Sequence, residues 1–113
     1  MASVSNITNK VLKDLGTTEQ TLITTAFNQK GACVGLSVCN TTNGVVAVTI
    51  YLEDELGVKG KYVDRLEIAP RSSARIINGG EKLLLAPTNT VSIVSDTATS
   101  VDVIFSLVVI TYT

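Results

Sequence analysis

Residues 32–53 read ACVGLSVCNTTNGVVAVTIYLE and carry the clearest strand signals in the chain. Apolar residues recur at every second position both before and after a central polar turn. A period of two is typical of β-strands, and an Asn-Gly pair between two such runs favours a hairpin. This stretch therefore predicts two strands, 32–40 and 44–53, that pair antiparallel across the turn at Asn43-Gly44.

The same pattern continues on both sides of this stretch, where short apolar runs are separated by turn residues. Val, Ile and Thr together make up 39 of the 113 residues, and such residues suit a pleated, half-buried surface. We therefore predict an all-β fold, a single antiparallel β-sandwich of about eight strands that is jelly-roll-like or immunoglobulin-like. The predicted strands are 20–27, 32–40, 44–53, 61–69, 73–78, 81–86, 90–95 and 101–113.

The first part of the chain is predicted to form an N-terminal arm, residues 1–17, ahead of a sandwich domain of residues 18–113. Ile7, Val11 and Leu15 recur at every fourth position, which fits a short helix. The same stretch also fits an extended strand, and the β character of the rest of the chain favours an extended or irregular arm. An arm of this kind is expected to order on a neighbouring subunit and clamp it.

The last predicted strand is apolar on both faces, because Val103, Phe105 and Leu107 alternate with Ile104 and Val108. Two interpretations stay open: a central strand covered on both sides, or a strand with one face packed against another subunit. The candidate oligomer or capsid contacts are the apolar residues of the arm and of one face of this strand. They are Ile7, Val11, Leu12, Leu15, Ile104, Val108 and Ile110.

The two cysteines, Cys33 and Cys39, lie within one predicted strand. Six residues of extended chain separate their Cα atoms by roughly 20 Å, whereas a disulfide needs Cα atoms within about 7 Å. Their positions have the same parity, so both are predicted to point to one face of the strand. The pattern favours two small buried thiols in a reducing compartment over an intermolecular bridge or reactive thiols.

The composition argues against catalysis. The chain has no His, which removes the commonest general base and the commonest metal ligand, and its net charge of −1 offers no basic surface for nucleic acid. The acidic run Glu53-Asp54-Glu55 is interpreted as a solvated hairpin tip rather than a calcium site. The apolar run 103–110 is too short to span a bilayer, and the N-terminus lacks the apolar core of a signal peptide. We expect no enzyme activity, cofactor, metal, nucleic acid or membrane partner.

Five segments of the chain carry a family resemblance. They are TEQTLITT at 18–25, VGLSVCNTT at 34–42, VAVTIYL at 46–52, LEIAPRSS at 66–73 and GGEKLLL at 79–85. Their order resembles that of small β-sandwich virion proteins of tailed bacteriophages, and the resemblance covers about residues 18–113.

The resemblance implies a non-enzymatic structural part of a bacteriophage virion. It favours a capsid decoration (cement) protein that binds the major capsid protein shell as a homo-oligomer, with a trimer favoured. A neck or tail accessory protein (adaptor or fibre) is the alternative that the resemblance leaves open. A carbohydrate- or ligand-binding β-sandwich module is the hypothesis that competes with it. The implied partners are further copies of the chain and other virion proteins, and the implied location is the virion after synthesis in the host bacterial cytoplasm.

Overall fold

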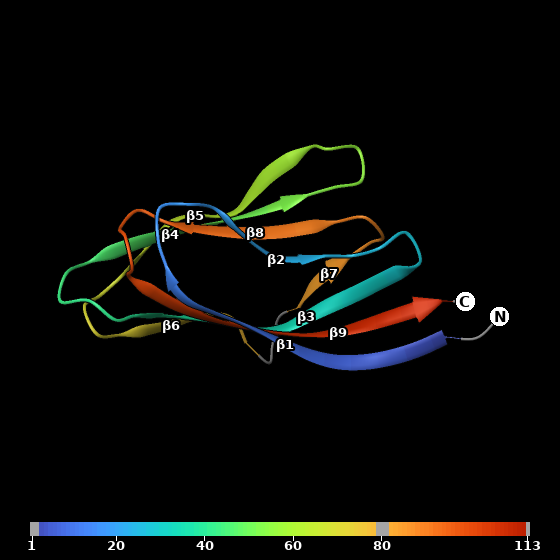
Figure 1. The fold of residues 1–113 in the computed structure, drawn as a ribbon, viewed down its shortest axis with the longest axis horizontal. Coiled ribbons are helices and arrows are strands. Elements are labelled where there is room, and N and C mark those ends of the chain that lie inside the picture. The colour runs from blue at the N-terminus through green and yellow to red at the C-terminus, as the bar shows by residue number, and fades with distance from the viewer. Residues whose placement is uncertain (1–2, 79–81, 113) are drawn as a thin grey trace.

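The computed structural model describes residues 3–78 and 82–112, and all regular structure in these ranges is β. Two antiparallel sheets face each other (Figure 1), which confirms the predicted β-sandwich. A helix able to cross a membrane is absent from the described ranges. The strands are β1 (Ser3–Leu15), β2 (Gln20–Thr24), β3 (Gln29–Asn40), β4 (Val46–Glu53), β5 (Lys59–Ile68), β6 (Ser73–Ile77), β7 (Leu83–Leu85), β8 (Thr90–Ser95) and β9 (Val101–Tyr112).

The strand order is that of a jelly roll. Sheet A runs β1-β9-β3-β6, with β7 also paired to β3, and sheet B runs β2-β8-β4-β5. β7 pairs with residues 31–33 of β3 and β6 with residues 36–39, so the two short strands share one position in the sheet. With that position counted once, the chain passes back and forth between the sheets, as two successive Greek keys require.

The predicted strands all have counterparts from β2 to β9. Local alternation and turn residues suffice for this, because they act within a few neighbouring residues. Residues 81 and 113, at the ends of two predicted strands, lie outside the described ranges. The arm adopts the extended alternative: residues 3–15 form β1, which pairs with β9 as part of sheet A.

The predicted hairpin between 32–40 and 44–53 is wrong, although both strands exist. β3 lies in sheet A and β4 in sheet B. β4 is flanked by β8 and β5, and its residues 46–50 are buried on both faces. Because β8 and β5 occupy the two edges of β4, neither edge is left for β3.

The loop after β3 is a corner between the two sheets, built around the side chain of Asn40. Asn40 is fully buried, and its Nδ2 donates to the carbonyl oxygens of Gly44 at 2.7 Å and Ile68 at 3.0 Å. Its Oδ1 accepts from the backbone N–H of Thr42 at 2.9 Å. One amide thus satisfies the backbone of both the loop and the end of β5, which fixes the path of the chain across the sandwich.

The two cysteines point to opposite faces of β3, so the prediction of a shared face is wrong. The pairing of β3 with β9 shifts between Cys33 and Gly35, which places Val34 in a β-bulge. A bulge adds one residue to a strand and reverses the parity of every residue beyond it. Cys33 is consequently buried, Cys39 is exposed, and both thiols are free.

This arrangement predicts a difference in thiol chemistry. Burial raises the pKa of Cys33 from 9.0 to about 11. Between these values the unfolded chain loses a proton that the folded chain keeps, so stability falls as the pH rises through this window. The measurement is the free energy of unfolding at several alkaline pH values, below the concentration of self-association. We expect Cys33→Ala to flatten the decline and Cys39→Ala to retain it; equal curves for the two variants would contradict the placement of Cys33.

Candidate assembly surface

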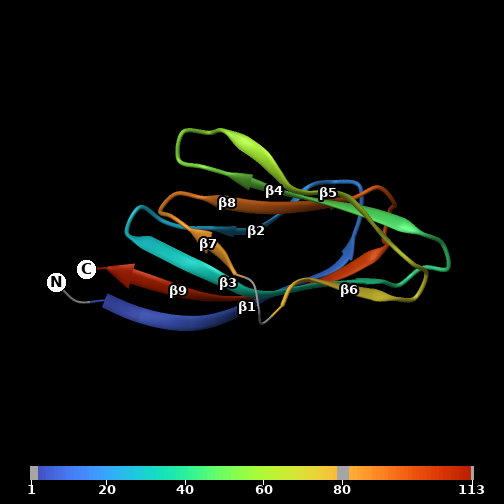
Figure 2. The same cartoon turned by 180° about the vertical axis from the view of Figure 1, so that it is seen from behind.

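β1 is the edge strand of sheet A, and its outer edge has no strand partner within the described chain. It pairs with β9 without a register shift from Ser3, opposite Tyr112, to Leu12, opposite Val103. Residues 3–10 are all exposed, so backbone pairing holds this strand more than side-chain burial does. Figure 2 shows β1 alongside β9 at the margin of the sheet. A free edge presents a row of backbone groups that can pair with another chain.

One face of β1 continues the outer face of β9. Phe105 points into the core. The even-numbered residues of β9, among them Ile104 and Val108, therefore point outward. Val11 lies opposite Ile104 and Ile7 opposite Val108. Ile7 is 82% exposed, Val11 63% and Ile104 51%. Two apolar cross-strand pairs therefore face solvent on this side of the sheet.

The apolar row extends across sheet A as far as β7. Val108 lies opposite Ala32 on β3, and Ala32 lies opposite Leu84 on β7, which is exposed. A shallow groove of about 300 Å³ follows this part of the face. Its lining residues are Lys30, Gly31, Ala32, Leu84, Leu85, Val108 and Ile110. Of these, Leu84 is 73% exposed and Ala32, Val108 and Ile110 are partly exposed. A contiguous apolar face of this kind is typical of a surface that contacts another protein.

The other edge strands carry features that discourage pairing with another chain. β2 and β6 have five residues each and β7 has three. β5 is longer, but its register with β4 is interrupted, Arg65 has a left-handed backbone (φ 53°), and charged residues recur along it. In β1, by contrast, the regular stretch from Ser3 to Leu12 contains a single charged residue, Lys10.

The predicted contact residues divide into two groups. Those on the outer face of sheet A are Ile7, Val11, Ile104, Val108 and Ile110. Leu12 packs against the core from the opposite face of β1, and Leu15, 3% exposed, is a core residue. The assembly surface, as the term is used below, is the free edge of β1 together with the outer residues Ile7, Val11, Ile104, Val108, Ile110, Ala32 and Leu84.

The sequence reasoning missed Ala32 and Leu84. The run of three leucines at 83–85 has no apolar–polar alternation, so nothing in it marks the middle residue as the outward one. The structure shows that Leu85 is buried and that Leu83 packs against the core, which leaves Leu84 outside. Strand assignment with a period of two would have identified Leu84 once either neighbour was placed in the core.

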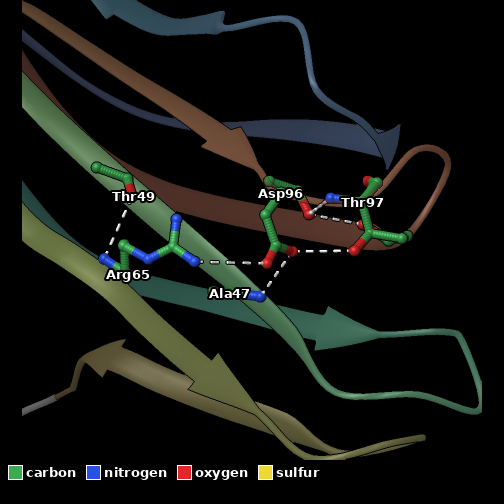
Figure 3. A network of polar contacts seen from close by, with 7 residues as sticks. Ala47, Thr49, Arg65, Asp96 and Thr97 are labelled. Carbon is green, nitrogen blue, oxygen red and sulfur yellow. Dashed lines mark hydrogen bonds and ion pairs between the residues drawn. The ribbon is translucent and has the colours of Figure 1, made fainter.

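A polar cluster joins β4, β5 and the loop after β8 (Figure 3). Asp96 Oδ1 accepts hydrogen bonds from the backbone N–H of Ala47 at 3.0 Å and from Thr97 Oγ1 at 2.9 Å. The bond from Ala47 contributes most to lowering the pKa of Asp96. The Arg65 guanidinium lies 4.0 Å from Asp96, and the Arg65 N–H donates to Thr49 Oγ1 at 3.2 Å. These contacts hold the irregular part of β5 against the sheet. Both partners in each of them belong to this chain.

The described residues offer little chemistry for a reaction. The sequence has no His, and in residues 3–78 and 82–112 no three His, Cys, Asp or Glu side chains are grouped to hold a metal ion. The Cys33 thiol is buried with a raised pKa, which opposes formation of the nucleophilic thiolate.

No protein-family model and no curated protein sequence matches this chain. Solved structures do match it. A subunit of Bacillus endospore appendages, described as a novel family of disulfide-linked pili, superposes with a TM-score of 0.57 at 20% identity, over 96% of this chain and 87% of that chain. A chain of infectious bursal disease virus, Gx strain, superposes with a TM-score of 0.51 at 12% identity, over 98% of this chain and 32% of that chain. At these identities the likeness concerns the fold, and this chain spans about a third of the viral one.

Proposed function

We propose that this protein is a non-enzymatic structural subunit that associates with further copies of itself through the assembly surface. The observation that carries the proposal is β1, a long and regular edge strand whose outward face is apolar and exposed. Natural proteins usually protect such an edge strand against pairing with another chain. An edge strand without this protection indicates a partner strand. The scarcity of groups for catalysis supports a role in contact rather than in chemistry.

Two kinds of assembly fit this proposal. The sequence resemblance favours a virion protein of a tailed bacteriophage, with decoration of the capsid shell first and a neck or tail accessory role second. This virion role is the first candidate. The second candidate is a surface appendage, which is supported by the appendage subunit that this chain matches over 87% of that subunit's length. A decoration protein is expected to form a closed oligomer, whereas an appendage subunit polymerises into an open filament.

The cysteines favour the first candidate over a disulfide-linked polymer. A chain that is linked covalently in series needs at least two accessible thiols per copy. The sequence has two cysteines, of which Cys33 is buried and Cys39 is exposed. A single accessible thiol can join copies only in pairs. We therefore propose a closed, non-covalent oligomer.

Light scattering on the purified chain, over a range of concentrations, tests this proposal. We expect the native protein to exceed the monomer mass and Ile7→Lys to raise its dissociation constant at least 10-fold, because the variant places a charge in an apolar contact. Leu56→Lys is the matched control. Leu56 is 83% exposed on the loop between β4 and β5, against 82% for Ile7, and its replacement should leave the mass unchanged.

A native protein that stays monomeric at every concentration would overturn the proposal of self-association. If Ile7→Lys and Leu56→Lys lower the measured oligomer mass equally, self-association does not depend on the assembly surface, and that part of the proposal is wrong. Far-ultraviolet circular dichroism of both variants establishes that they remain folded, as expected for substitutions at exposed positions.

A further inference from the structure

We propose that two copies of this chain pair antiparallel through their β1 strands, with Asn9 of each copy on a two-fold axis. This inference rests on the proposed function, since it names the partner and the geometry of the same surface. The contact is isologous, because both copies contribute the same strand. It would join sheet A of one copy to sheet A of the other through main-chain hydrogen bonds.

The pairing must keep the outward faces of the two copies on one side. In the regular stretch of β1, from Ser3 to Leu12, the outward positions are the odd-numbered ones, which include Ile7, Asn9 and Val11. Residues opposed in an antiparallel pair point to the same side of the sheet. Odd positions of one copy must therefore oppose odd positions of the other. The numbers of two opposed residues then add up to an even number, and this sum differs by two between neighbouring registers.

The register centred on Asn9 matches the apolar residues. It places Ile7 of each copy opposite Val11 of the other. The cross-strand pairs within each copy, Val11 with Ile104 and Ile7 with Val108, then join into apolar rows that run across the contact. In this register residues 6–12 of the two copies oppose each other, all within the part of β1 that pairs regularly with β9.

The neighbouring registers lose this match. Centring the pair on Thr8 sets both outward apolar side chains opposite polar ones, and centring it on Lys10 brings two lysines side by side on the axis. With Asn9 on the axis, Lys10 opposes Thr8 and Lys13 opposes Ser5 of the second copy, so no like charges meet. Of these three registers, charge and hydrophobicity both favour the one centred on Asn9.

Asn9 itself suits a position on the axis. Its Oδ1 accepts a hydrogen bond from Ser106 Oγ at 2.8 Å, which orients the amide on the outer face of the sheet. The Nδ2 group keeps its two donors, so the amides of the two copies can bond each other across the axis. A polar pair within an apolar stripe disfavours shifted registers, in which an amide would face an apolar side chain.

Disulfide trapping tests the register. The variant is Asn9→Cys in a Cys39→Ser background, which removes the exposed native thiol and retains buried Cys33. On the axis, the two introduced residues have Cα atoms about 4.5–5.5 Å apart, within the range of a disulfide. We expect mild oxidation of the oligomer to give a covalent dimer as the main species on a non-reducing gel, and a reductant to reverse it.

Ser5→Cys in the same background is the matched control, since Ser5 is exposed on the same face of the same strand. In the proposed register Ser5 opposes Lys13, and the two Ser5 positions lie roughly 26 Å apart along the strands. This variant should remain monomeric on the gel. A further test mixes Ile7→Cys with Val11→Cys, which should form the mixed dimer and little of either homodimer.

The outcomes separate this inference from the proposed function. A monomeric native protein in light scattering would overturn both. An oligomer in which Asn9→Cys does not cross-link, or in which Ser5→Cys cross-links equally well, would overturn the register and leave self-association in place. A closed trimer would also overturn the two-fold pairing alone, because an isologous contact cannot close a three-fold ring.

Discussion

Replacing Phe105 with Ala is expected to lower the free energy of unfolding by about 4 kcal/mol. Phe105 lies on β9 in the core and has the largest of the fully buried side chains. The chain has no Trp, and Phe27, its second Phe, is 84% exposed, so neither residue type can fill the lost volume. Much of the surrounding core is Val and Ile, whose side chains are stiff and cannot collapse into the cavity.

Phe27 provides the matched control for this prediction. It is 84% exposed, and Phe27→Ala should change the stability by no more than about 0.5 kcal/mol. Equilibrium unfolding in urea, at one fixed protein concentration, measures both variants under equal mass action. If Phe105→Ala fails to fold, Phe105→Leu should still fold, with a loss of about 1 kcal/mol. Equal stability of the two alanine variants would contradict the placement of β9 in the core.

Replacing Asn40 with Ala is expected to cost about 3 kcal/mol of stability, the second largest effect among these substitutions. The substitution removes no large apolar volume. Its cost arises because Asn40 Nδ2 donates to the carbonyl oxygens of Gly44 and Ile68, and these groups would lose a partner at the corner between the sheets. The backbone N–H of Thr42 would lose its acceptor as well.

Asn43 is the matched control, since it lies in the same loop and is exposed. Asn43→Ala should stay within about 0.5 kcal/mol of the native protein. Asn40→Asp adds a second readout: at neutral pH a carboxylate oxygen would face carbonyl oxygens, so this variant should be at least as unstable as Asn40→Ala. Lowering the pH should recover part of the loss, because the protonated acid can donate. Equal free energies of unfolding for Asn40→Ala and Asn43→Ala would contradict the structural role of Asn40.

The assembly surface could be predicted in part. Apolar residues at Ile7 and Val11, and on alternate positions of the last strand, are visible in the sequence, and the structure places them on one face. Leu15 follows the same four-residue spacing but is buried, because β1 bends into the core after the register shift that follows Leu12. Spacing along the chain does not reveal where a strand leaves the surface.

The positions of the strands and the sandwich class follow from the residue pattern alone, because alternation, β-branched residues and turn residues act over a few neighbouring positions. The sequence also limited the chemistry, through the lack of His. Which strands pair depends instead on how the whole chain packs. β3 and β4 bury the same kinds of side chain whether they pair with each other or lie in opposite sheets, so the pattern cannot distinguish the two. The bulge at Val34 is likewise a product of pairing with β9, and it alone separates a buried Cys33 from an exposed Cys39.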